Sequence, residues 1–199
     1  MPTPTGTPFT FSYALVLLAT SLYAEFGDPA TVAALQQASS TDVAHLVRMP
    51  PSALAASALW AAGGPLSPFT IAFVPVLTTL ERRIGALRTA AVFAVGHVVA
   101  TLVTEVPVAV SVVAGRLPAS SLHRLDYGIS FGLLACVGAL AGLLNRWARV
   151  LVLVCVGSML LYDLAVFADP VADWGHPLAL LTGVSGWLLV RRAAFRRRG

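Results

Sequence analysis

Two apolar segments of this chain begin with residues that could act as a nucleophile and a base. Ser130 opens one of them, after Gly128, and His176 opens the other, close to the C-terminus. A serine hydroxyl within hydrogen-bonding reach of an imidazole can attack a carbonyl carbon, while the imidazole takes up and returns the proton. Ionisable residues in membrane helices are costly and usually functional. Ser130 and His176 are therefore the candidate catalytic pair.

The composition is that of an integral membrane protein. Hydrophobic residues make up 57% of the chain, charged residues only 11%, and the mean hydropathy is +0.81. A chain of 199 residues is long enough for one compact bundle, so residues 1–199 are expected to form a single domain. The fold class that follows is all-α.

Apolar runs predict six membrane-spanning helices, at about residues 9–25, 66–80, 89–113, 128–144, 150–167 and 174–190. Several runs are at or below the usual length of about 20 residues, which predicts short helices or a locally thinned bilayer. The long connection at 26–64 is expected outside, with short apolar helices lying in the interface of the outer leaflet.

Arginine placement predicts the orientation. All 13 basic residues are arginines, which gives a net charge of +4. In the six-span topology only Arg48, Arg116 and Arg124 fall outside, and the other ten gather on the opposite side. This asymmetry is typical of a multi-pass protein of the plasma (inner) membrane with both termini cytoplasmic. The terminal arginines then face anionic lipid, and nucleic acid is not an expected partner.

Three motifs follow one another at a recognisable spacing. Glu81 is followed by Gly85 after the second span, Gly128-x-Ser130 opens the fourth, and His176 in the sixth is followed by Ala179 and Gly183. In this order the motifs resemble those of the rhomboid family of intramembrane serine proteases, from about residue 40 to residue 190. The resemblance implies a six-helix rhomboid-like bundle, a catalytic pair formed by Ser130 and His176, and no cofactor.

Helix geometry agrees with this resemblance. The fourth and sixth spans both enter from the outer side, which places Ser130 and His176 about 5 Å below the interface. Ala179 and Gly183 give the sixth span a face of small residues, for which Gly132 or Gly138 could supply the partner. Close approach of the two helices would allow the Ser–His hydrogen bond. Glu81 and Gly85 are expected to be structural, at the cytoplasmic turn.

The chain departs from the family pattern around the oxyanion. The second span of the family carries His-x-x-x-Asn, and the corresponding positions here fall near Pro65 and Phe69, which offer no side-chain donor. Phe131 also stands where the family commonly has glycine. Backbone amides near Ser130, within Gly128–Phe131, remain as expected oxyanion donors.

The third span carries polar residues on one face, with His97, Thr101 and Glu105 spaced four apart. They are expected to form a buried network, hydrogen-bonded to Asp126 or Asp163, or to replace the missing oxyanion donors. A metal site built from His97, Glu105, Asp163 and His176 is an alternative without the spacing that usually supports one.

The resemblance implies an intramembrane serine protease that cleaves transmembrane protein substrates in the bilayer. An inactive rhomboid-like protein that binds transmembrane clients is the competing hypothesis, and a small-solute transporter is a third. If the pair is not catalytic, Ser130 only packs or caps its helix, and His176 pairs with Asp173 or a carbonyl. A Ser130 hydroxyl within about 3.2 Å of a His176 nitrogen would favour the protease. A cavity filled by Phe131 would favour the inactive protein.

Overall fold

The computed structural model describes residues 1–64, 66–167 and 169–197, so Pro65 lies outside the described residues. Every element of regular secondary structure in these residues is helical. The elements are α1 (Pro8–Phe26), α2 (Pro29–Ala38), α3 (Val43–Arg48), α4 (Pro50–Ser57), α5 (Pro68–Ile84), α6 (Ala86–Val113), η1 (Ala119–His123), α7 (Ser130–Ala141), α8 (Arg146–Val166), α9 (Pro170–Ser185) and α10 (Trp187–Arg196).

Local sequence signals set most helix starts. Proline occupies the first turn where its missing N–H costs nothing, at the start of α1, α2, α4, α5 and α9. Side-chain caps accept a hydrogen bond from a first-turn amide in α2, α3, α5, α8 and α9, through Asp28, Asp42, Ser67, Asn145 and Asp169.

Each of the six predicted spans overlaps a helix, but fewer helices qualify as spans by length and apolarity. Among the described residues α1, α6 and α8 do, and α9 with α10 counts as a fourth if this pair, bent by 48°, is one span. The structure therefore has three to four candidate spans, and the count of six stays a prediction.

Helix α7, predicted at 128–144, has only 12 residues. It can be short because protein, rather than lipid, surrounds it, as most of its residues are buried.

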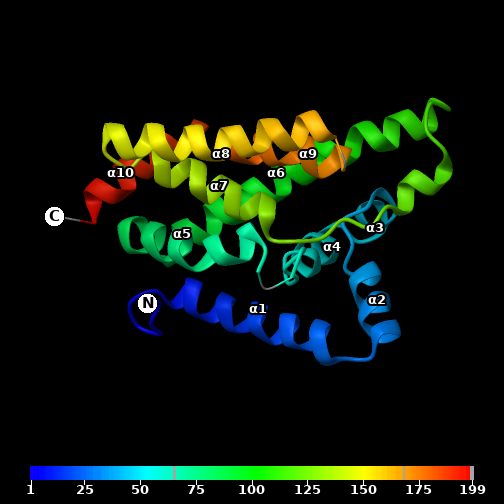
Figure 1. Ribbon diagram of the computed structural model, residues 1–199, viewed down its shortest axis with the longest axis horizontal. Helices are drawn as coiled ribbons and strands as arrows, with labels where there is room; N and C mark the ends of the chain where they lie inside the picture. Colours follow the sequence, from blue (N-terminus) through cyan, green and yellow to red (C-terminus); the bar gives the residue numbers. More distant parts are fainter. Residues whose placement is uncertain (65, 168, 198–199) are drawn as a thin grey trace.

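Helix α7 is the centre of the bundle, packed against α9, α6 and α5. Helices α1 and α8 lie at opposite edges, and both termini lie at the end of the bundle where α5 ends and α10 lies (Figure 1). We call this the terminal end. Helices α2, α3 and α4 lie within the predicted connection of residues 26–64, towards the opposite end, where α6 also ends; we call this the loop end.

Glu81 joins α5 to the start of α1. Its side chain is almost fully buried and accepts hydrogen bonds from the Phe9 amide (3.0 Å), the Thr10 amide (2.8 Å) and the Thr10 hydroxyl (2.6 Å). Two of these donors are first-turn amides of α1, which no carbonyl within the helix can satisfy. Gly85, at a φ of 91°, then turns the chain from α5 into α6. The carboxylate thus serves as the N-terminal cap of α1.

Replacing Glu81 with alanine is expected to destabilise the fold by about 3 kcal/mol, because buried amides lose a charged acceptor. Thermal unfolding of the purified protein in detergent measures the loss as a lower Tm. Glu25→Ala is the matched control, since Glu25 is an exposed carboxylate on the same helix α1. Equal Tm values for the two variants would contradict the capping role.

Candidate active site

Ser130 and His176 come from neighbouring helices. Ser130 is the first residue of α7, whose N-cap Ile129 offers no side-chain acceptor, so the first-turn amides of Ser130, Phe131 and Gly132 have no partner within the helix. His176 lies in the second turn of α9. The sequence predicted that its span begins at 174, but the structure begins α9 at Pro170 because Asp169 caps it there.

Two glycines bring α7 and α9 into backbone contact. A Cβ at Gly183 of α9 would collide with the carbonyl oxygen of Ala135, and a Cβ at Gly138 of α7 would collide with that of Leu180. Ala179, one turn before Gly183, is fully buried. Of the two glycines predicted to face α9, Gly138 does so, whereas Gly132 packs against the ring of Phe93 on α6. This close contact fixes Ser130 and His176 at neighbouring positions.

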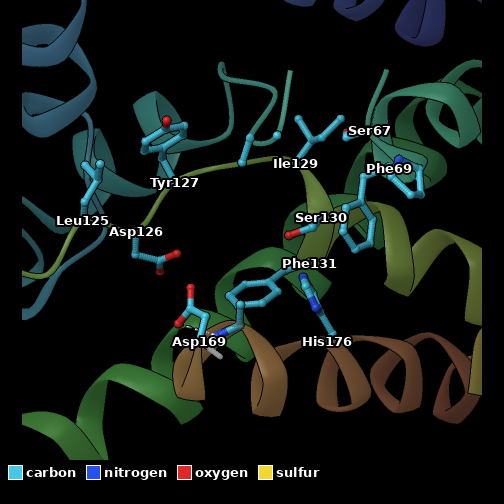
Figure 2. Close-up of a pocket in the computed structure, with 14 residues that line it drawn as sticks. Ser67, Phe69, Leu125, Asp126, Tyr127, Ile129, Ser130, Phe131, Asp169 and His176 are labelled. Atoms are coloured by element: carbon cyan, nitrogen blue, oxygen red, sulfur yellow. Dashed lines mark hydrogen bonds between the residues drawn. The ribbon is translucent and has the colours of Figure 1, made fainter. Parts of the chain in front are cut away.

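A cavity of about 430 Å³ opens between these helices and the chain that enters α7. Its lining includes Ser130, Phe131, His176, Phe69, Asp126 and Asp169. Figure 2 shows the Ser130 and His176 side chains in this space, with the rings of Phe131 and Phe69 on either side of the imidazole. Nucleophile and base candidates thus share one pocket, with two carboxylates further along its wall.

Ser130 and His176 are not hydrogen-bonded to each other in the structure, and no dashed line joins them in Figure 2. The His176 ring packs against Phe69, with centroids 4.9 Å apart, and meets the edge of Phe131 at 5.5 Å. Its Nδ1 atom is enclosed and lacks a hydrogen-bond partner among the described residues. The 3.2 Å criterion is therefore not met, and Phe131 lines the cavity without filling it. The pairing of His176 with Asp173, which belongs to the inactive alternative, is also not seen, and Asp173 accepts from the Asp169 amide instead.

Residues at the loop end hydrogen-bond to the non-helical segment that leads into Ser130. The Thr41 amide and hydroxyl donate to the backbone oxygen of Asp126 (2.7 and 3.1 Å), and the hydroxyl also lies 2.9 Å from its carboxylate. The Gly128 amide donates to the Ser57 carbonyl (3.0 Å), at the end of α4. Burial raises the pKa of Asp126, and the hydrogen bond from Thr41 opposes this shift. The predicted supporting residue Gly128, at a φ of 137°, is thus a fixed point two residues before Ser130.

His97 lies outside the Ser130 cavity. Its Nε2 atom is 3.1 Å from both the Leu54 carbonyl and the Ser57 hydroxyl, so it binds the end of α4. Ser57 is fully buried and cannot meet a substrate, which makes this Ser–His pair structural. Since Ser57 in turn holds Gly128, His97 supports the Ser130 segment through α4. Thr101 is buried one turn further along α6, and its hydroxyl has no partner among the described residues.

The remaining polar residue of the α6 face, Glu105, contacts other partners than those predicted. Glu105, almost fully buried on α6, lies 3.9 Å from Arg124, which lies 3.8 Å from Asp169. The expected hydrogen bonds of the α6 face to Asp126 or Asp163 are not formed. Within the described ranges no three His, Cys, Asp or Glu side chains are grouped to hold a metal ion, so His97, Glu105, Asp163 and His176 do not assemble.

Sequence reasoning missed the residues that hold this site from the loop end. The run Ser40–Asp42 was interpretable only as a helix start, which Asp42 does provide by capping α3. That the neighbouring Ser40 and Thr41 also hold Asp126 depends on a contact between residues about 85 positions apart, for which the sequence gives no local signal. Phe69 offers no side-chain donor, and the sequence has no signal for the tilted packing of its ring against His176.

Comparison with known families identifies the chain at the family level. A family model described as rhomboid-like protein matches residues 5–195, nearly the whole chain, so the chain belongs to the rhomboid-like family. No curated protein and no solved structure matches it. Together with helices apolar enough to cross a bilayer, the family fits a multi-pass membrane protein.

Proposed function

We propose that this rhomboid-like protein is an intramembrane serine endopeptidase. The observation that carries the proposal is the shared cavity, because a nucleophile at a helix N-terminus and an imidazole line the same space. The imidazole Nδ1 atom has no hydrogen-bond partner among the described residues. Catalytic hydrogen bonds are often long or misaligned before substrate binds. The proposal requires the imidazole of His176 to turn away from Phe69 and towards the Ser130 hydroxyl when substrate binds.

The reaction would follow the acyl-enzyme route. Ser130 Oγ attacks the scissile carbonyl carbon while His176 takes the hydroxyl proton, and His176 then returns this proton to the leaving amine. A water molecule, deprotonated by His176, then attacks the ester carbonyl, and His176 returns this proton to Ser130 Oγ as the new C-terminal carboxylic acid is released. The amides of the first turn of α7, at Phe131 and Gly132, are the available donors to the oxyanion, since neither Phe69 nor Phe131 donates from its side chain.

The substrate class follows from the position of the cavity. Six spans in a single domain, with both termini cytoplasmic in the plasma membrane, would place Ser130 near the outer surface, where water is available. A transmembrane helix hides its carbonyls in internal hydrogen bonds. The substrate is therefore a transmembrane protein whose helix unwinds near its outer end.

A second function is favoured by the aromatic packing around the imidazole. With His176 between Phe69 and Phe131, and without a Ser–His hydrogen bond, the protein would be an inactive member that binds transmembrane clients. Phe131 would then fill the place of the substrate.

The two functions differ in a cleavage assay. Proteoliposomes containing the full chain and a single-span reporter, with helix-breaking residues near its outer end, are expected to release a reporter fragment. Ser130→Ala is expected to abolish this release, whereas Ser158→Ala, at an exposed serine of α8, leaves it unchanged. A fragment that forms equally with Ser130→Ala would come from another activity. Reporter that binds without being cut would support the inactive client-binding protein.

A further inference from the structure

A second cavity, at the terminal end of the bundle, combines three arginines with an apolar wall. It has a volume of about 450 Å³ and lies between α6 and α10. Arg88 comes from α6, and Arg192 and Arg196 come from successive turns of α10. The remaining lining is apolar and includes Ile84, Val92 and Leu189. We call this cavity the arginine groove.

The arginines of the groove have no carboxylate partners. In the part of the chain that the structure describes, the only ion pairs involve Asp42, Glu105 and Asp169, all near the loop end. Helices α5 and α10 contain one acidic residue, Glu81. Its carboxylate is buried and accepts hydrogen bonds from backbone amides of α1. The positive charge of the groove is therefore left for a ligand outside the chain.

Helix α10 has the character of a helix that lies at a membrane surface. It bends by 48° from α9, and it alternates exposed apolar residues, among them Leu189 and Phe195, with its arginines. At its start, Trp187 lies beneath the guanidinium groups of Arg149 (5.1 Å) and Arg191 (5.3 Å). Amphipathic helices of this kind, with tryptophan and arginine side by side, are typical of the headgroup level.

We propose that the arginine groove is a binding site for one anionic phospholipid. Its phosphate would lie between Arg88, Arg192 and Arg196, where guanidinium groups can donate paired hydrogen bonds to phosphate oxygens. Its acyl chains would follow the apolar wall towards the middle of α6. The apolar wall favours a lipid over a free anion, because inorganic phosphate gains nothing from burying Val92 and Leu189. The site is separate from the Ser130 cavity and does not depend on proteolysis.

The test compares two double variants that remove the same charge. Arg88→Gln with Arg192→Gln changes the groove, and Arg82→Gln with Arg146→Gln removes two exposed arginines that do not line it. The full chain is purified in neutral detergent, and phosphatidylglycerol is titrated in mixed micelles while bound lipid is counted by native mass spectrometry. Phosphatidylcholine and inorganic phosphate are titrated in parallel, and thermal unfolding checks that each variant is folded.

The wild type is expected to retain one phosphatidylglycerol. The groove variant weakens this binding roughly 25-fold, at about fivefold for each arginine, and the control variant weakens it less than threefold. Phosphatidylcholine or inorganic phosphate binding as tightly as phosphatidylglycerol would overturn the proposal, the latter pointing to a free-anion site. Equal loss in both variants would also overturn it, since bulk charge alone would then explain binding. If the groove variant proves unfolded, Arg192→Gln with Arg196→Gln replaces it under the same criteria.

Discussion

Replacing Gly183 with valine is expected to separate α7 from α9 and to destabilise the fold by about 3 kcal/mol. Gly183 has no space for a side chain, because a Cβ would collide with the carbonyl oxygen of Ala135 and lie 2.8 Å from the Ala139 amide nitrogen. Both obstacles are backbone atoms of α7, so no rotamer change can relieve the overlap. The helices must move apart, which also moves His176 away from Ser130.

Gly157→Val provides the matched control, since Gly157 lies inside the apolar helix α8 and a Cβ there meets nothing within 4 Å. Thermal unfolding in detergent is expected to show a large decrease in Tm for Gly183→Val and little change for Gly157→Val. Equal decreases would mean that the loss comes from valine in a membrane helix, and the proposed role of the α7–α9 contact would be wrong.

The positions of the helices were accessible from the sequence because apolar runs, proline starts and polar caps are local signals. Each predicted span overlaps an observed helix, Gly183 does face α7, and Ala179 is fully buried. Helix length was less accessible. Apolarity alone predicted a span at 128–144 for α7. A short helix enclosed by other helices is equally apolar, because its residues are buried in protein.

The candidate site was only partly predictable, for a physical reason. That Ser130 and His176 lie near one cavity follows from two helices that pack closely, as their glycines indicated. The surroundings of each side chain depend on long-range contacts instead. Phe69 reaches His176 across the bundle, and His97 turns towards α4 rather than towards Ser130. No periodicity in the sequence specifies such pairs.

Activation of Ser130 by His176 is the central step of the proposed mechanism. A fluorophosphonate modifies only a serine whose hydroxyl is made nucleophilic by a base, and it needs no knowledge of the substrate. The reagent is applied to the purified full chain, and peptide mass spectrometry locates the adduct. Ser158→Ala controls for the loss of a serine elsewhere in the helices.

The expected result is an adduct on Ser130 in the wild type and in Ser158→Ala, none on this position in Ser130→Ala, and labelling about 10²–10⁴-fold slower in His176→Ala. Folded wild-type protein that remains unlabelled, or labelling of Ser130 at an unchanged rate in His176→Ala, would contradict the proposed catalytic pair and leave client binding as the function.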